Sequence, residues 1–321
     1  MRRSALLPIV FSAVCSIAIA AQEHSTLKAQ PPVTLRYLGT AGWEISNSAV
    51  TILVDPYVSR INGPPPPSGA GIPLAGDSRP KVGWDDTATS DTAAVESRIP
   101  RADYVLVTHT HYDHVLDVPQ IALKKRATVI GTESTANVMR AYGVPEAQLI
   151  IVRGGEDYEF GTFSLKVIPS LHSSLDHKHY FSSETAPPNL KAPLTLRQIH
   201  PEGGTLAYLV RIGGHRIVVF GGMNYMEREL VGLQPDVAIV GAAGSRKEIY
   251  DYTGRLMRVL GNPPLVIPTH WDNFLLPFRA SQQTAIDAVQ QFVHEVQAAS
   301  PGTNVIVPNY FEAISLKNPG N

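Results

Sequence analysis

The chain carries, at positions 108 to 114, the sequence Thr108-His109-Thr110-His111-Tyr112-Asp113-His114, directly after an apolar run from Tyr104 to Val107. The apolar run predicts a buried strand, so the segment forms the loop where that strand ends. Active sites of α/β proteins are commonly built on such loops. The segment holds three of the 11 histidines of the chain and one aspartate. Imidazoles and carboxylates are ligands of divalent ions such as zinc, so the segment predicts a metal site.

The spacing within the segment favours this interpretation over ordinary core or surface histidines, which is what a lone histidine usually is. His109 and His111 are two residues apart, so in extended backbone both side chains point to one side and can bind the same ion. Asp113 and His114 are adjacent. After a turn of the chain they can face a second position a few ångströms away, as two-metal hydrolytic sites require.

Composition and charge describe an ordinary soluble globular protein. The 321 residues carry a formal net charge of -1, and 44% are hydrophobic and 17% charged. Lys and Arg are spread along the chain, so neither a basic nucleic-acid surface nor an acidic disordered tail is expected. The partner is therefore expected to be a small-molecule substrate.

The N-terminus predicts a signal peptide over residues 1–21, followed by a linker over residues 22–32. Arg2 and Arg3 form a positive start, an apolar stretch runs from Ala5 to Ala21, and Ala18-Ile19-Ala20 offers small residues for a signal peptidase. The alternative is an uncleaved membrane anchor, but Pro8 interrupts a run that is short for a bilayer span. We expect an exported protein, periplasmic or secreted, without stable membrane insertion after cleavage.

Cys15 is the only cysteine, so the mature chain has no thiolate for metal binding or nucleophilic catalysis. Any metal must be held by His, Asp, Glu, Asn or backbone oxygen. The arginine pair leaves the general and the twin-arginine export routes open.

Short segments rich in Val, Ile and Leu predict strands, and apolar residues at helical spacing predict helices. The expected strands are Val33 to Leu38, Ala49 to Val54, Tyr104 to Val107, Ala127 to Ile130, Phe163 to Ile168, Thr205 to Ile212, His215 to Phe220, Val237 to Val240, Leu265 to Ile267 and Phe311 to Leu316. The expected helices are Thr135 to Tyr142, Glu248 to Leu260 and Ala280 to Ala299. This order suggests sheets covered by helices in one domain over residues 33–317. Insertions at about 59–100 and 173–203 lack such patterns and are expected to border the site.

Two further histidines stand at strand ends. His172 follows the strand that begins at Phe163, and His270 lies in Pro268-Thr269-His270-Trp271-Asp272-Asn273-Phe274, directly after another strand. Strand ends converge on one edge of a layered fold, so these distant side chains can meet the first cluster. The remaining histidines, among them His200 and His215, have no comparable context.

The chain resembles the metallo-β-lactamase-fold superfamily of metal-dependent hydrolases over nearly all residues from Val33 to Leu316. The resemblance rests on these elements: Tyr37-Leu38-Gly39-Thr40-Ala41-Gly42-Trp43, Leu53-Val54-Asp55-Pro56-Tyr57, the HxHxDH motif from His109 to His114, His172 and His270. The opening element and the ending from Thr269 to Phe274 resemble the branch similar to ascorbate-phosphate lactonases and N-acyl-phosphatidylethanolamine phospholipases.

The resemblance implies a four-layer αββα sandwich, an α/β fold of two mixed β-sheets flanked by helices. It also implies that one metal is held by His109, His111 and His172, and a second by Asp113, His114 and His270. One or two zinc ions are expected, with manganese or iron as alternatives. The implied activity is hydrolysis of an ester-type bond, a phosphodiester or a lactone, by a metal-activated water that Asp113 helps to orient.

Several neighbouring side chains are candidates for supporting roles. Asp55 and Asp272 could accept protons from the ligating imidazoles, although an Asp before Pro is also a common turn residue. Tyr225 and Trp271 could line a substrate pocket, or serve as ordinary aromatic packing. His177 and His179 could contact substrate or be solvated.

One departure from the family pattern concerns the carboxylate that usually bridges both metals. The family supplies it from a Gly-Asp pair after the strand His215 to Phe220, whereas this chain reads Gly221-Gly222-Met223-Asn224-Tyr225. Asn224 offers only a neutral amide oxygen, a weak ligand. A single-metal enzyme, or a non-catalytic metal-containing binding protein, is therefore an alternative to a two-metal hydrolase. A β-lactamase is a lower-ranked alternative.

Overall fold

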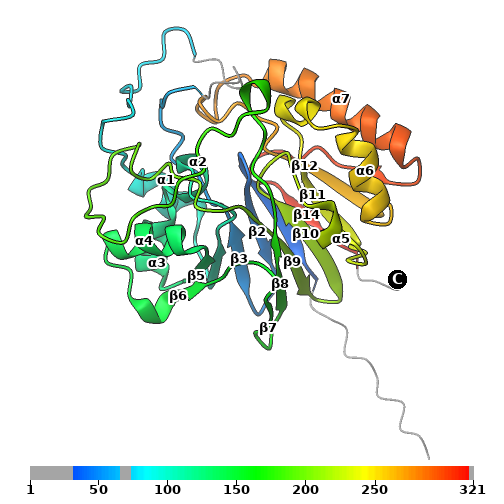
Figure 1. Cartoon of the computed structure of the whole chain (residues 1–321), viewed down its shortest axis with the longest axis horizontal. Helices are drawn as coiled ribbons and strands as arrows, with labels where there is room; N and C mark the ends of the chain where they lie inside the picture. Colours follow the sequence, from blue (N-terminus) through cyan, green and yellow to red (C-terminus); the bar gives the residue numbers. More distant parts are fainter. Residues whose placement is uncertain (1–31, 66–73, 318–321) are drawn as a thin grey trace, which may run out of the picture.

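Two seven-stranded sheets face each other in the computed structural model, which describes residues 32–65 and 74–317. The first sheet has the order β14-β1-β2-β3-β4-β5-β6 and the second the order β13-β12-β11-β10-β9-β8-β7 (Figure 1). The strands of the first sheet are β1 (Thr34–Gly39), β2 (Gly42–Ser46), β3 (Thr51–Val54), β4 (Tyr104–Leu106), β5 (Thr128–Gly131), β6 (Leu149–Ile151) and β14 (Ala313–Ser315). Those of the second are β7 (Asp157–Glu159), β8 (Ser164–Pro169), β9 (Leu206–Ile212), β10 (His215–Phe220), β11 (Val237–Gly241), β12 (Leu265–Thr269) and β13 (Asn304–Val305).

Helices cover the outer face of each sheet, which makes four layers. The α-helices are α1 (Thr92–Arg98), α2 (Tyr112–Val115), α3 (Val118–Lys125), α4 (Glu133–Ala141), α5 (Glu227–Leu230), α6 (Tyr252–Val259) and α7 (Gln283–Ala299). Short 3-10 turns lie at Glu146–Gln148, Asp176–Lys178 and Gly244–Glu248. Figure 1 shows α3 and α4 beside the first sheet, and α6 and α7 on the opposite side, beside the second. The four-layer αββα sandwich expected from the sequence is confirmed.

Some inner strands are buried along their whole length because both of their faces are covered. Every residue of β3 and of β11 is buried, as continuous apolar strands of parallel sheets usually are. Between the sheets, Trp43 and Val54 from the first pack in one core with Val167 and Tyr208 from the second. On the outside of the second sheet, α7 buries Val289, Phe292 and Val296, which are three and four residues apart and so share one helix face.

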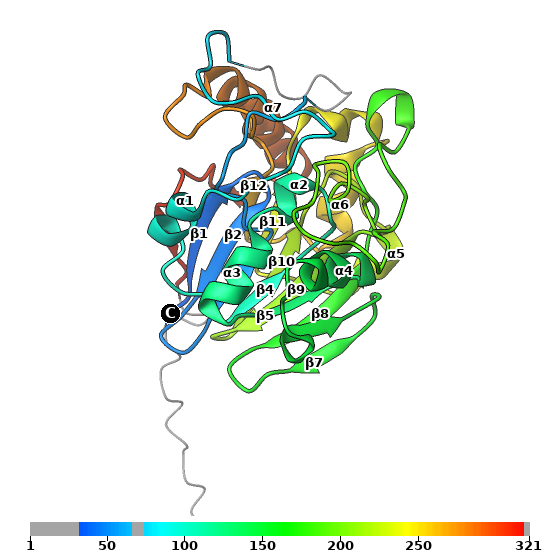
Figure 2. The same cartoon turned by 90° about the vertical axis from the view of Figure 1, so that its left-hand side faces the viewer.

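Strand direction brings several loops to one edge of the sandwich. β3, β4 and β5 run parallel in the first sheet. In the second, β10, β11 and β12 run parallel, and β8 has the same direction because β9 is antiparallel to both β8 and β10. Figure 2 shows α2, which follows β4, at the same end of the sheets as α7. The loops after β4, β8, β10 and β12 therefore meet there.

The structure adds elements that the sequence patterns did not predict. β2, β6, β7 and β13 are strands of two to five residues, too short to show a clear pattern, and α3 has Pro119 in its first turn. The insertion at 59–100 contains α1. The expected signal peptide and residues 22–31 of the expected linker lie outside the described residues. Within residues 32–65 and 74–317, no helix has the length and apolarity that a membrane span requires.

Candidate metal centre

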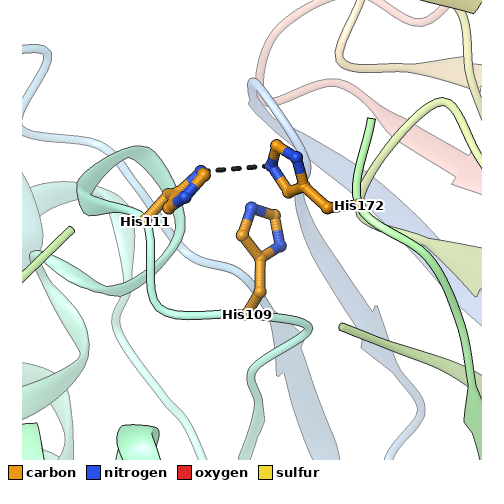
Figure 3. Close-up of side chains that lie close together, drawn as sticks. All are labelled: His109, His111 and His172. Carbon is orange, nitrogen blue, oxygen red and sulfur yellow. Dashed lines mark hydrogen bonds between the residues drawn. The ribbon is translucent and has the colours of Figure 1, made fainter. Parts of the chain in front are cut away.

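The first group of metal-binding side chains consists of His109, His111 and His172, all of them buried. His109 and His111 come from the loop after β4, and His172 comes from the loop after β8 in the other sheet. One ring nitrogen of each histidine is a possible ligand atom, and these three nitrogens lie within 4.8 Å of one another. Figure 3 shows the three rings converging, with His172 Nε2 3.1 Å from His111 Nδ1.

The environment of these nitrogens fits a metal ion. Two nitrogens bound to one tetrahedral ion at about 2.1 Å lie roughly 3.4 Å apart, close to the separation of His111 Nδ1 and His172 Nε2. His109 Nε2 is buried and has no hydrogen-bond partner. The opposite nitrogens are held in place: His172 Nδ1 lies 2.9 Å from the carbonyl oxygen of Ser173, and His109 Nδ1 lies 3.1 Å from Thr108 Oγ1. Such contacts fix the ring orientation that a metal ligand needs.

The second group consists of Asp113, His114 and His270, whose ligand atoms also lie within 4.8 Å of one another. Asp113 Oδ2 lies 3.5 Å from His114 Nε2 and 3.3 Å from His270 Nε2. The two groups are adjacent, since the rings of His109 and His114 have centroids 3.9 Å apart. The structure thus brings together all six side chains that the sequence named as metal ligands.

Asp55 contacts the second group through the ring nitrogen of His114 that faces away from the other two ligands. Its Oδ2 lies 2.8 Å from His114 Nδ1 and accepts a hydrogen bond from Thr108 Oγ1, while its Oδ1 accepts one from Thr108 N at 2.7 Å. The carboxylate is fully buried. It therefore holds the proton of His114 on Nδ1 and leaves Nε2 free to bind an ion.

Asp272 does not have the role expected for it. Its Oδ1 accepts hydrogen bonds from Tyr37 Oη at 2.7 Å and from Thr40 N at 2.9 Å. Its Oδ2 accepts one from Tyr310 Oη at 2.7 Å and pairs with the guanidinium of Arg60. The expectation that it accepts a proton from a ligating imidazole is wrong, because both oxygens serve this buried network beside His270.

Asn224, the candidate weak ligand, turns its amide toward backbone. Its Nδ2 donates to the carbonyl oxygen of His172 at 3.2 Å, and its Oδ1 accepts from Tyr225 N at 2.9 Å. The structure therefore does not bring Asn224 into either group. At the place of the usual carboxylate, a side chain on Gly222 would first meet Ser173 Oγ at 3.0 Å.

Burial and neighbouring charges shift the pKa values of five of the six side chains. Burial lowers the pKa of His109 and of His111 well below 6.5 and that of His172 to about 4, so these rings are neutral at pH 7. Burial also opposes charge on His114, but Asp113 and Asp55 outweigh it and raise its pKa. Burial opposes ionisation of Asp113, yet His114 and His270 hold its pKa well below the usual range. Neutral imidazoles and an ionised carboxylate are the forms that bind metal.

A cavity of about 520 Å³ opens onto both groups. Trp271 lines it, as expected, and packs against Tyr37 and Tyr310 as well. Tyr225 is not among its lining residues, because its hydroxyl donates to the carbonyl oxygen of Tyr252 on the outer side of the second sheet. His177 and His179 are exposed and do not line it.

His200 lines the cavity although its neighbours along the chain did not mark it as a site residue. Its ring stacks on that of His111, with centroids 4.0 Å apart and an angle of 9° between the planes. Burial lowers the pKa of His200 to about 4, and neither ring nitrogen has a hydrogen-bond partner. No strand precedes this residue, so only the packing of the insertion at 173–203 reveals its position.

Comparison with known proteins adds the family context. A family model described as "Beta-lactamase superfamily domain" matches residues 51–271. A UPF0173 metal-dependent hydrolase of Staphylococcus aureus (strain MRSA252) is 29% identical over 208 residues, which are 64% of this chain and 82% of that relative.

Solved structures resemble the fold over most of the chain. Igni18, a metallo hydrolase from Ignicoccus hospitalis KIN4/I, has a TM-score of 0.56 at 17% identity and covers 89% of this chain and 99% of its own. An isothiocyanate hydrolase from Delia radicum gut bacteria has a TM-score of 0.55 at 16% identity, with coverages of 88% and 99%. The metallo-beta-lactamase fold protein YhfI from Bacillus subtilis has a TM-score of 0.51 at 13% identity, with coverages of 89% and 99%. At these identities the likeness concerns the fold alone.

Proposed function

The chain belongs to the beta-lactamase superfamily and has the metallo-β-lactamase fold, and we propose that this metal-dependent hydrolase cleaves an ester-type bond, a phosphodiester or a lactone. One observation carries the proposal: two adjacent groups of three metal-binding side chains face a single cavity. This ligand set suits hydrolysis more than binding alone. Three side-chain ligands on each ion leave a coordination position open for water or substrate.

In this proposal His109, His111 and His172 hold one ion, and Asp113, His114 and His270 hold the other. The ligand set of imidazoles and one carboxylate suits zinc, with manganese or iron as alternatives. A bound divalent ion lowers the pKa of water and polarises a carbonyl or phosphoryl oxygen. Asp113 is ionised, and its Oδ2 lies 3.3 Å from His270 Nε2 within the second group. It can therefore also orient a water for attack.

The test combines metal analysis with a substrate panel. We expect the purified protein to contain one to two equivalents of zinc, and to hydrolyse either bis(4-nitrophenyl) phosphate or a lactone. His111→Ala removes a ligand nitrogen of the first group. It should abolish the activity and lower the metal content. His294→Ala is the matched control, because His294 is exposed on α7. Metal-loaded protein that hydrolyses nothing in a broad ester, lactone and phosphodiester panel would refute the proposal.

A second variant addresses the missing bridging carboxylate. Gly222→Asp puts a carboxylate where the family usually has one, although its Cβ must displace Ser173 Oγ. A gain in zinc stoichiometry and activity indicates that the natural chain works with a weakened second ion. A loss of activity indicates a site adapted to the absence of that carboxylate.

We also propose that the enzyme is exported and that residues 1–21 are removed. The support is the arrangement of Arg2, Arg3, the apolar stretch and the small residues at Ala18-Ile19-Ala20. Expression of the full chain in a bacterium, fractionation and N-terminal sequencing test it directly. We expect the mature chain in the periplasm or medium to begin close to Gln22, whereas an intact N-terminus in the cytoplasmic fraction contradicts export.

A further inference from the structure

Three rings from the two insertions stand together at the cavity beside the first metal-binding group. Trp84 comes from the insertion at 59–100, and Phe181 and His200 come from the insertion at 173–203. The centroid of Trp84 lies 5.5 Å from that of Phe181 and 4.8 Å from that of His200, and Phe181 and His200 are 4.7 Å apart. All three line the cavity. We refer to Trp84, Phe181 and His200 as the aromatic wall.

Backbone hydrogen bonds between the insertions hold this wall in place. Arg197 N donates to the carbonyl oxygen of Trp84 at 2.8 Å. Leu196 N donates to the carbonyl oxygen of Asp86, and Ala88 N to that of Leu194, each at 3.0 Å. The segments that carry Trp84 and His200 are therefore joined, and Phe181 packs against both of these rings, so the arrangement is preformed before any ligand binds.

The wall stands directly against the metal-binding side chains. The ring of His200 stacks on His111, and the centroid of Phe181 lies 6.3 Å from that of His111. A substrate group resting on the wall is thus next to the first group of ligands. His200 also brings two ring nitrogens without hydrogen-bond partners, and a buried polar group left unpaired is costly.

The charges around the cavity limit what can bind there. Among the described residues that line it, the ionisable side chains are histidines, Tyr112, Asp113 and Asp272, and none is Lys or Arg. The aromatic wall itself therefore offers no cationic side chain to a charged substituent, and any positive charge in the cavity would come from bound ions. The lining also includes small residues, among them Ala242, Ala243 and Ala285, which leave room for an apolar group.

We infer that the aromatic wall is the specificity site for the substrate, whose flat, uncharged apolar group packs on Trp84 and Phe181 while a polar atom pairs with His200. This inference rests on the proposed function and adds to it that the ester-type substrate carries such a group beside the bond that is cleaved. The two insertions thus determine the substrate, and the metal-binding loops supply the chemistry.

The test measures binding of two probes to zinc-loaded protein by calorimetry, without turnover. The probes are naphthalene-2-methanol, which is neutral, and naphthalene-2-sulfonate, which has the same rings and a negative charge. We expect both probes to bind the natural protein, the neutral one through its rings without any charge that the ions attract. Phe181→Leu and Trp84→Leu, which keep an apolar side chain, should each weaken its binding by about 3- to 10-fold, the contribution of one aromatic pair.

Phe160→Leu is the matched control, since Phe160 is also a partly buried phenyl ring but packs against Tyr104 and Phe163 outside the cavity. It should leave the affinity unchanged. Equal affinities for the neutral probe in Phe181→Leu, Trp84→Leu and Phe160→Leu overturn the inference. Ring-dependent binding without hydrolysis of any ester overturns the proposed function and leaves the binding site standing, so the two failures are distinguishable.

Discussion

Replacing Asp55 by asparagine tests how far the metal site depends on a residue that binds no metal. The carboxylate accepts hydrogen bonds from Thr108 N, Thr108 Oγ1 and His114 Nδ1. Asparagine has nearly the same shape, but one of its two terminal atoms is an NH2 donor. In either orientation of the amide, that donor faces a group that is itself a donor. Because Thr108 N cannot accept, the amide oxygen faces Thr108 N and the NH2 faces His114 Nδ1, which removes the contact that keeps the proton of His114 on Nδ1.

The expected magnitude follows from these contacts. Loss of an outer partner of a metal-binding histidine typically weakens metal affinity by about 10- to 100-fold, or roughly 1.4 to 2.8 kcal/mol. The effect should fall on the second group, because Asp55 contacts His114 directly and reaches the first group only through Thr108. A buried donor left without an acceptor also lowers the free energy of unfolding by about 1–3 kcal/mol.

Zinc titration against a chromophoric chelator resolves the two affinities. Asp117→Asn is the matched control: Asp117 is equally buried, and accepts hydrogen bonds from Val58 N at 2.7 Å and Ser59 N at 2.9 Å, away from the metal-binding side chains. It should destabilise the protein without changing zinc affinity. Equal zinc affinities in the natural protein and Asp55→Asn, or an equal loss at both ions, would refute the reasoning.

Three further predictions concern stability. A Cβ at Gly221 would lie 2.0 Å from Thr108 Oγ1, so Gly221→Ala should lower the free energy of unfolding by about 1–3 kcal/mol in urea titrations, and an unchanged value contradicts the contact. In metal-free protein His172 has a pKa of about 4, below the 6.5 of the unfolded chain, so the unfolded state takes up a proton first as the pH falls. Between pH 7 and 5, His172 should therefore lower the free energy of unfolding by about 2 kcal/mol. A free energy of unfolding that rises over this range refutes the sign. Asp272→Asn breaks a buried ion pair and should lower the free energy of unfolding by about 3–5 kcal/mol in urea titrations. Asp85→Asn, on an exposed pair, should leave it almost unchanged, and equal losses in the two variants contradict this reasoning.

The sequence predicted which candidate ligands converge, because these side chains are tied to local patterns. Each of His109, His172 and His270 follows an apolar strand, and strand direction alone brings such positions to one edge. The four-layer fold followed from the same strands and from the family resemblance. The sequence patterns did not predict the short strands β2 and β6. These segments are strands because they pair with neighbouring strands, not because of their composition.

The misassigned and missed residues depend on contacts between distant segments. Asp272 follows two residues after His270, yet its partners Tyr37, Arg60 and Tyr310 come from three other parts of the chain. His200 reaches the cavity only because the two insertions pair with each other. Neither periodicity nor spacing in the sequence carries this information.

The six metal-binding side chains are divided between the two sheets in a way that affects the whole molecule. His109, His111, Asp113 and His114 follow β4 of the first sheet, while His172 and His270 follow β8 and β12 of the second. Each group contains members from both sheets, so an ion bound to either group would cross-link the halves of the sandwich at one end of their shared core. Metal occupancy would then stabilise the folded chain, by about 2.7 kcal/mol per ion at a free concentration 100 times the dissociation constant. Resistance to heat and to proteases should therefore follow metal supply, and the protein level in a cell would report the metal available to it.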